Sequence, residues 1–353
     1  MDADKYIDLS IQLLRKLISI PSVSRDEKLA ADHLEAFLGE MGQKPVRSDN
    51  NILLRHHISD QLPSILLNSH IDTVKPVEGW TKDPFDAVFE DGLIYGLGSN
   101  DAGASMVCLL ATYLHFSSQP ELPYNLVFAA TAEEEVSGKK GVSSILEDLG
   151  KIDLGIVGEP TKCNMAIAEK GLMVLDCLVS GKSAHAASGE GVNAIYEAQG
   201  DLDWFRKYRF KESSTWLGEV NMQVTQIEAG TQHNVVPDVC RFVVDVRTNE
   251  RYDNHSVYEL IKENVTCKVE ARSFRLNPSS IPETHPIVQR GREMGLEAFG
   301  SATLSDQSLM PFTTLKIGPG DSRRSHTADE YISIEELKQG INTYIQLLDG
   351  LQV

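Results

Sequence analysis

The chain of 353 residues has few of the features that mark membrane, secreted or nucleic-acid-binding proteins. No apolar run reaches the length of about 18 residues that a membrane-spanning helix needs. The five cysteines are odd in number and scattered, with no C-x-x-C pair, which argues against a disulfide framework and favours reduced thiols. Positive charge is scarce, because 33 Lys and Arg face 51 Asp and Glu. The net charge of -18 argues against nucleic acid or an anionic membrane as a partner.

The start of the chain also lacks the apolar segment of a secretion signal. It reads Met1-Asp2-Ala3-Asp4, which is acidic. Together with the cysteine pattern, this predicts a cytoplasmic protein. The composition, 41% apolar and 24% charged, is that of a soluble globular protein, and the length favours two domains over one.

The pattern of elements changes twice along the chain. Short apolar strands alternate with helices up to about residue 170 and again from residue 280, which predicts a mostly parallel sheet covered by helices on both faces. Between them, the elements from Met173 to Arg272 follow the order β-α-β-β-α-β of a ferredoxin-like unit. We therefore predict a three-layer α/β domain of residues 1–170 and 280–353, interrupted by an inserted α+β domain of residues 171–279.

Two Ser-x-x-Glu patterns predict capping boxes. Ser24 and Glu27 precede an amphipathic segment, and Ser333 and Glu336 precede the last one. In a capping box the serine hydroxyl accepts from the third helical N–H and the glutamate reaches back to the serine N–H. Helices are expected to begin at both places.

The strand Ile65–Asn68 leads directly into a His-x-Asp. Three apolar residues in a row are typical of a strand buried on both faces, and His70 follows at the edge where open α/β sheets bind ligands. Asp72 points the same way as His70 in an extended chain. A metal-binding imidazole usually donates its other N–H to a carboxylate or carbonyl, so Asp72 is a candidate to orient His70.

Further acids also follow predicted strands or turns. Gly96-x-Gly98 lacks the third glycine of a dinucleotide fingerprint and is read as a tight turn that presents Asp101, unless Asp101 only caps the next helix. Glu133-Glu134-Glu135 follows an apolar strand, where three acids require solvent or partners. Glu159 again follows a strand, and His326 lies on a loop before the last helix. Two imidazoles with several carboxylates at one sheet edge are the ligand chemistry of a dinuclear zinc site.

These motifs, in this order along nearly the whole chain, resemble the di-zinc deacylase and aminopeptidase family of the acetylornithine deacetylase and succinyl-diaminopimelate desuccinylase type. The resemblance implies two Zn²⁺ per chain, for which Co²⁺ or Mn²⁺ can substitute. It implies that Asp101 bridges the metals, that His70 and Glu159 complete one site, and that Glu135 and His326 complete the other. Glu134 would be the general base and Asp72 the partner that orients His70.

Two positions depart from the family pattern. Leu97 stands where the family often has Arg, and Gly103 stands where it often has Lys. Neither is a metal ligand, so the departures concern the local scaffold and the entry of substrate.

The inserted domain carries a second set of matching residues. By the resemblance, this domain is a lid and forms a homodimer, and His185 donates to the oxyanion in the neighbouring subunit's site. Asn234 and Arg247 look like substrate binders, Arg247 with a fork suited to a carboxylate. From the residues alone, His185 is equally an ordinary surface side chain, and Arg247 is equally a strand residue paired with Asp245 or Glu250.

The expected activity is metal-dependent hydrolysis of the amide bond of an N-acyl amino acid. The resemblance points first to N-acetyl-L-ornithine and arginine biosynthesis. N-succinylornithine or N-succinyl-diaminopimelate is the alternative, followed by a dipeptidase or aminoacylase activity. A non-catalytic protein that binds N-acyl amino acids is the hypothesis from a different class.

Overall fold

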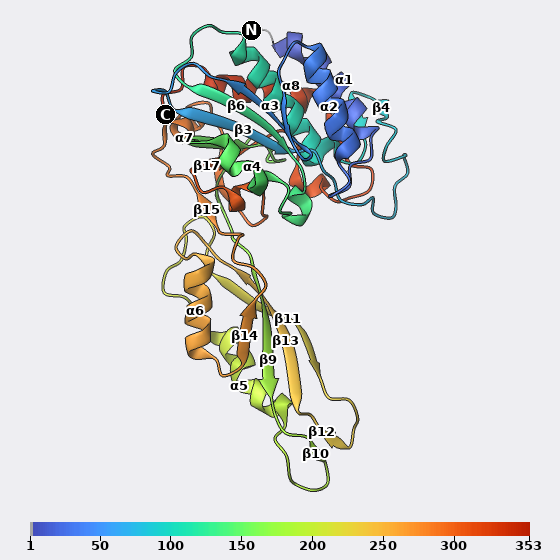
Figure 1. Ribbon diagram of the computed structural model, residues 1–353, viewed down its shortest axis with the longest axis vertical. Coiled ribbons are helices and arrows are strands. Elements are labelled where there is room, and N and C mark those ends of the chain that lie inside the picture. Colours follow the sequence, from blue (N-terminus) through green and yellow to red (C-terminus); the bar gives the residue numbers. More distant parts are fainter. Residues whose placement is uncertain (1–2) are drawn as a thin grey trace. The chain divides into compact units, whose positions relative to one another are not determined.

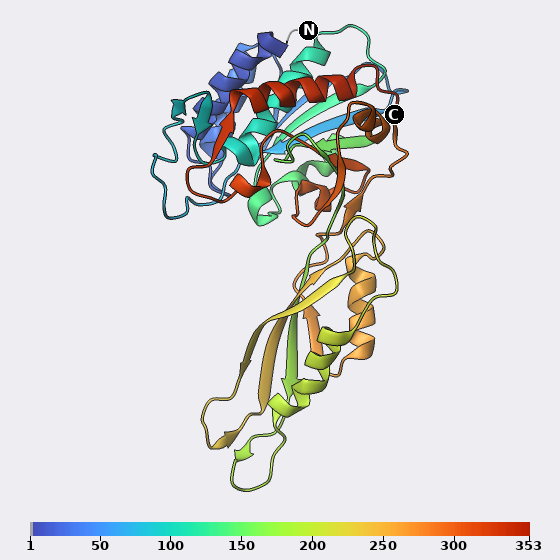
Figure 2. The ribbon, with the colours of Figure 1, turned by 180° about the vertical axis from the view of Figure 1, so that it is seen from behind.

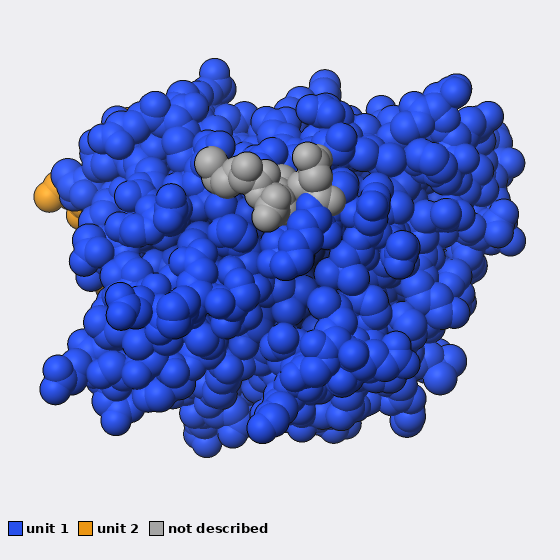
Figure 3. Space-filling view, turned by 90° about the horizontal axis from the view of Figure 1, so that it is seen from above, with its two compact units in different colours: residues 1–167, 280–299, 305–353 blue, residues 168–279, 300–304 orange. Residues whose placement is uncertain are grey.

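The computed structural model describes residues 3–353, so the first two residues of the acidic start lie outside the described residues. The chain forms two compact units, coloured separately in Figure 3. Unit 1 consists of Met1–Ile167, Ser280–Phe299 and Ser305–Val353, and unit 2 consists of Ala168–Ser279 and Gly300–Leu304. The short return of the chain to unit 2 at Gly300–Leu304 has no signal in the sequence.

Unit 1 is built on a sheet whose central strands are parallel. The order β6-β3-β7-β17 forms this centre (Figure 1). The pairs at both edges, β1 with β2, β2 with β6, and β17 with β8, are antiparallel. This confirms the predicted α/β class. The strands along the sheet are β1 (Val46–Ser48), β2 (Asn51–His56), β6 (Asn125–Thr131), β3 (Ser64–His70), β7 (Leu154–Val157), β17 (Thr314–Lys316), β8 (Met165–Glu169) and β15 (Ser279–Ser280), with β16 (Ala298–Ser301) paired to β8.

Helices cover both faces of this sheet, as predicted. On one face lie α1 (Ala3–Ile18), α3 (Ala104–Ser117) and α8 (Ile334–Leu348), and α8 is the red helix in Figure 2. The rings of Tyr113 in α3 and Phe128 in β6 pack 6.2 Å apart there. On the other face, Val142 and Ile145 of α4 (Val142–Leu149) pack on alternate residues of β3 and β6. α2 (Lys28–Glu40) contacts β2, and α7 (Pro286–Glu293) contacts α8.

The two predicted capping boxes have different outcomes. Ser333 and Glu336 form the predicted box at the start of α8. The box at Ser24 is wrong, because α2 begins after Glu27 and the Ser24 hydroxyl donates to Asp72 Oδ2 at 2.7 Å instead. The hydroxyl of Ser24 donates to a charged acceptor, and such charge-assisted hydrogen bonds are stronger than neutral ones, which favours the long-range contact.

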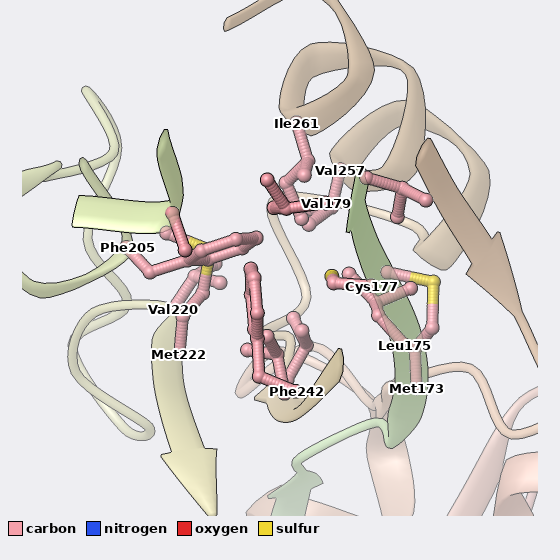
Figure 4. Packing of buried hydrophobic residues seen from close by; sticks show 14 of the residues in the cluster. Met173, Leu175, Cys177, Val179, Phe205, Val220, Met222, Phe242, Val257 and Ile261 are labelled. Atoms are coloured by element: carbon pink, nitrogen blue, oxygen red, sulfur yellow. The ribbon is translucent and has the colours of Figure 1, made fainter. Parts of the chain in front are cut away.

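Unit 2 has the predicted β-α-β-β-α-β order of elements. These are β9 (Met173–Ser180), α5 (Ala194–Lys207), β11 (Asn221–Ala229), β13 (Val239–Arg247), α6 (Asn254–Asn264) and β14 (Lys268–Ala271), and the antiparallel sheet has the order β11-β13-β9-β14. Figure 4 shows its core, where the rings of Phe205 in α5 and Phe242 in β13 meet edge to face at 6.0 Å. A two-stranded ribbon of β10 (Ala184–His185) and β12 (Val235–Val236) is also present.

A separate three-stranded sheet has the order β18-β5-β4. A turn at Asp91-Gly92, a dipeptide typical of hairpins, joins β4 (Phe89–Glu90) to β5 (Leu93–Tyr95), and β18 (Tyr331–Ser333) pairs with β5. Sequence reasoning missed β1, β8, β10, β12, β15, β16 and β18. Within residues 3–353, every helix is too short or too polar to cross a membrane.

Candidate metal centre

Six predicted site residues meet at one edge of the unit 1 sheet. His70 is the last residue of β3, Glu134 and Glu135 follow β6, and Glu159 follows β7. These three strands are parallel, so their carboxyl ends lie at the same edge, which is where open α/β sheets bind ligands. Asp101 precedes α3, and His326 lies on the loop between β17 and β18.

The first cluster joins His70, Asp101 and Glu159. Nε2 of His70 lies 3.4 Å from Asp101 Oδ1 and 3.9 Å from Glu159 Oε1. One possible ligand atom can be chosen from each residue such that the three atoms all lie within 4.8 Å of one another. This is a geometry that can hold a metal ion.

The second cluster joins Asp101, Glu135 and His326. Nε2 of His326 lies 3.0 Å from Glu135 Oε2 and 3.6 Å from Asp101 Oδ2. Asp101 therefore faces His70 with one carboxylate oxygen and His326 with the other. A carboxylate shared in this way is suited to bridge two cations about 3.5–4 Å apart.

His70 is oriented for a metal by its surroundings. The ring is buried, and Nδ1 lies 2.9 Å from the carbonyl oxygen of Asp72 and 3.5 Å from its Oδ1. Nδ1 therefore carries the proton and donates to the carbonyl, which leaves a lone pair on Nε2. Nε2 is buried without a hydrogen-bond partner, and an orphaned acceptor aimed at two carboxylates fits a bound cation.

The carboxylate of Asp72 accepts hydrogen bonds from several residues of the site. Besides accepting from Ser24, its carboxylate accepts the backbone N–H groups of Glu134 at 3.0 Å and Glu135 at 3.2 Å. The predicted role toward His70 is thus joined by a second one, because the same side chain anchors the loop that carries Glu134 and Glu135.

The electrostatics of the site also favour cations. Burial raises the pKa of Glu134 well above its ordinary value, and it raises that of Glu159 to about 8, assisted by the nearby charge of Asp101. The hydrogen bond to Glu135 raises the pKa of His326 to about 9. Burial opposes the charged form of His70, but the nearby carboxylates of Asp101 and Asp72 hold its pKa well above normal. Carboxylates crowded in a buried site are stabilised by divalent cations.

Two further acids of the site were not predicted. Glu330 is buried, and its carboxylate accepts the N–H groups of Gly98 at 3.2 Å, Asn100 at 2.7 Å and Asp101 at 2.9 Å. Asp306 accepts from the side chains of Asn68 and Thr131, both at 2.8 Å. Glu330 lies four residues after His326, which was the one available signal. Asp306 has none, since it follows no recognisable strand.

The two departures from the family pattern lie beside this centre. Leu97 is buried and lines a cavity of about 30 Å³ together with Leu14, Phe85 and the site residues His70 and Asp101. A Cβ on Gly103 would lie 2.5 Å from the carbonyl oxygen of Gly98, so this chain has no room for a side chain at that position. Gly98 itself has φ +76° and packs against Thr73, which explains the tight turn before Asp101.

The predicted residues of unit 2 have different surroundings. His185 and Asn234 are exposed neighbours on the β10–β12 ribbon, where the Ala186 N–H donates to the Asn234 carbonyl at 2.9 Å. The Ala187 N–H donates to His185 Nδ1 at 3.1 Å. Arg247 forms a fork with Asp245, with Nε and Nη2 at 2.8 and 3.1 Å, which is the alternative pairing that the sequence left open.

Two His-carboxylate clusters that share Asp101, on a doubly covered α/β sheet, are typical of a metal-dependent hydrolase. Comparison with known proteins agrees with this class. The family model "Peptidase family M20/M25/M40" matches residues 66–350. The chain therefore belongs to this peptidase family, as the sequence motifs predicted, and it is an enzyme of the metallopeptidase and amidohydrolase class.

Individual relatives are similar over nearly their whole length. The acetylornithine deacetylase of Shigella sonnei is 26% identical, with 96% of each chain covered. The succinyl-diaminopimelate desuccinylase of Corynebacterium glutamicum is 27% identical, covering 93% of this chain and 92% of the relative. The fold matches that of the YXEP protein from Bacillus subtilis, described as a dinuclear metal-binding peptidase of the M20 family, with a TM-score of 0.75, 14% identity, and coverage of 99% and 100%.

Proposed function

We propose that the protein hydrolyses the amide bond of N-acyl amino acids with two zinc ions per chain, and that its substrate is N-acetyl-L-ornithine. The observation that carries this proposal is the pair of clusters that share Asp101. The names of the relatives that match almost the whole chain support the reaction class. The proposal places the enzyme in arginine biosynthesis in the cytoplasm.

His70, Asp101 and Glu159 would hold one ion, and Asp101, Glu135 and His326 the other. Imidazole and carboxylate ligands suit Zn²⁺ and leave Co²⁺ and Mn²⁺ as substitutes. When bound, the metal pair supplies Lewis-acid activation of a water molecule and of the scissile carbonyl.

Glu134 is the general base in this proposal. It is next to the ligand Glu135 on the same loop, and Asp72 holds the N–H groups of both residues. The carboxylate of Glu134 would take a proton from the attacking water and pass it to the leaving nitrogen. No Ser or Cys nucleophile is required.

The roles of unit 2 rest on the family resemblance. His185 would donate to the oxyanion of the neighbouring subunit, and Asn234 and Arg247 would bind substrate, with residues 171–279 forming the lid and the homodimer. Two surface features are compatible with the dimer. Strand β11 is at a sheet edge and largely exposed, and Tyr196 on α5 is 67% exposed. Unpaired edges and exposed apolar groups are features that pairing removes.

The alternatives differ mainly in the acyl group. Succinyl substrates are the first alternative, because a relative of similar identity bears a desuccinylase name. Dipeptides and other acylated amino acids come next, and binding without hydrolysis is the alternative of a different class.

A substrate panel tests the proposal. The zinc-loaded enzyme is assayed with N-acetyl-L-ornithine, N-succinyl-L-ornithine, N-succinyl-diaminopimelate and dipeptides. We expect the highest kcat/KM for N-acetyl-L-ornithine, and a tenfold preference requires about 1.4 kcal/mol of difference in the pocket. A higher kcat/KM for a succinyl substrate would replace the acetyl assignment, and binding of all ligands without hydrolysis would refute the enzymatic proposal.

A further inference from the structure

The loop that carries Glu134 and Glu135 is held in place through hydrogen bonds of its backbone N–H groups. Four successive N–H groups, from Ala132 to Glu135, each donate to a side chain from elsewhere in unit 1. Asp72 accepts the last two, as described above. The first two go to Asn51 at 2.9 Å and to Glu27 at 3.2 Å. The sequence motifs assign Asn51 no role, and they assign Glu27 only a place in a capping box that does not form.

Glu27 is a fully buried carboxylate whose bonds cross between elements. Glu27 lies just before α2, yet its side chain accepts no hydrogen bond from that helix. Instead it accepts the N–H groups of Arg25 and Glu133, and the Asn50 side chain at 3.0 Å. A buried carboxylate is costly unless donors surround it, so removing it leaves these N–H groups without their acceptor.

Asn51 uses both ends of its amide. Its Oδ1 accepts from Ala132, while its Nδ2 donates to the carbonyls of Ser48 at 3.0 Å and Lys140 at 2.7 Å. It opens β2, whose next residue, Ile52, pairs with Ala130 near the end of β6. The amide thus fixes the point where β6 ends and the loop begins.

Glu133, the first acid of the run, belongs to the same framework. Its backbone has φ +55°, and its carboxylate accepts the Lys140 N–H at 3.1 Å. The side chain fills the space beside Gly138, where an added Cβ would meet Glu133 Oε2 at 1.9 Å. The side chain of Glu133 therefore stabilises the loop and belongs to neither cluster. Its role differs from the proposed roles of Glu134 as base and Glu135 as ligand.

We propose that Glu27 and Asn51 are positioning residues for Glu134 and Glu135. They belong to neither cluster, and they act by fixing the peptide groups of Ala132 and Glu133, which immediately precede the base. The inference rests on the proposed function for the roles of Glu134 and Glu135. Outer partners of this kind typically contribute about 10–100-fold to metal affinity or activity.

The chain supplies a matched control on the same strand. Asn125 opens β6 at its opposite end, is similarly buried, and accepts the N–H groups of Ile58 at 2.7 Å and Ser59 at 3.0 Å. Asn51→Ala and Asn125→Ala therefore remove the same kind of clamp from the two ends of one strand. Only the first clamp holds the catalytic loop.

The experiment compares Glu27→Ala, Asn51→Ala and Asn125→Ala as zinc-loaded full-length proteins. We measure Tm, hydrogen–deuterium exchange of peptides that cover residues 126–140, and kcat and KM for N-acetyl-L-ornithine. Glu27→Ala and Asn51→Ala should speed exchange at residues 132–135 and lower kcat by about 10–100-fold with KM nearly unchanged. Asn125→Ala should lower Tm and retain the wild-type kcat.

Glu27→Gln is the conservative variant, useful if Glu27→Ala does not fold. It retains an acceptor oxygen for the Glu133 N–H and should recover most of the lost kcat. The proposal is overturned if Glu27→Ala and Asn51→Ala change kcat no more than Asn125→Ala does, or if exchange at residues 132–135 is unaltered. Wild-type activity in Glu134→Gln would overturn the proposed function instead, and the exchange data would still report on the clamp, so the two failures are distinguishable.

Discussion

The two groups of candidate functional residues differ in how firmly the protein holds them. In unit 1, the backbone N–H groups of Asp101 and Glu134 donate to side chains far away in the sequence, Glu330 and Asp72. The buried His70 ring is oriented by the carbonyl of Asp72, two residues further along. In unit 2, His185 and Asn234 are exposed on a two-stranded ribbon. Metal ligands must lie within fractions of an ångström of their positions, whereas groups that meet substrate on a closing lid need a defined position only in the closed state. Under the proposed roles, the residues of unit 1 are preorganised for the chemistry, whereas those of unit 2 would reach their positions only when substrate binds.

The largest effect should come from the base within the firmly held group. Glu134→Gln keeps the shape of the side chain and removes its ability to take a proton, so kcat should fall by about 10²–10⁴-fold while both metals remain bound. Steady-state kinetics with metal analysis checks this. Near-normal kcat in the variant would show that the assigned base is wrong.

The next effect tests the exposed group. His185→Ala should lower kcat by about 10²–10³-fold, the usual effect of losing an oxyanion donor, without loss of metal. Mixing His185→Ala with Glu134→Gln tests the homodimer, because each mixed dimer regains one site with both residues intact. Subunit exchange should restore part of the activity. A mixture that stays inactive after exchange, or a fully active monomer, would contradict a role across the interface.

A smaller effect is expected for Glu330, which holds the Asp101 segment through three N–H groups. Glu330→Gln keeps one acceptor and should weaken metal binding by about 10-fold, and Glu330→Ala by up to about 100-fold. Competition with a chelator measures this. Equal metal affinity in Glu330→Ala and wild type would show that the clamp is not needed to place Asp101.

The smallest effect concerns Arg247, whose guanidinium is already paired with Asp245. If Arg247 grips the substrate carboxylate, that carboxylate must compete with Asp245. Asp245→Asn should then lower KM by a few-fold, and Arg247→Lys should raise KM because lysine cannot form the bidentate fork. An unchanged KM in both variants would leave Arg247 as an ordinary strand residue.

The sequence predicts the residues of the two clusters better than it predicts the residues that hold them in place, for a physical reason. His70 and Glu159 follow apolar strands, a pattern that marks the ligand edge of a sheet. Glu27, Asn51, Asp306 and Glu330 act mainly through hydrogen bonds to backbone groups or to ordinary polar side chains, which leave no pattern of residue types.

The errors in predicted elements have similar origins. Ser24 matched a local capping motif, but its hydroxyl binds Asp72, 48 residues away. Strand β8, Met165–Glu169, was missed because it holds no Val, Thr or aromatic residue and follows β7 without an intervening helix. Where local patterns agree with long-range contacts, as at Ser333 and in the elements of unit 2, the prediction and the structure coincide.

The central claim is that one carboxylate, Asp101, serves two metal ions. Metal analysis of gently purified wild type, His70→Ala, His326→Ala and Asp101→Ala tests it most directly. We predict about two Zn²⁺ per chain in wild type. Each histidine variant should weaken mainly one site, and Asp101→Ala should weaken both. Loss of a single ion from Asp101→Ala, or equal loss of both ions from His70→Ala and His326→Ala, would contradict the shared-ligand geometry.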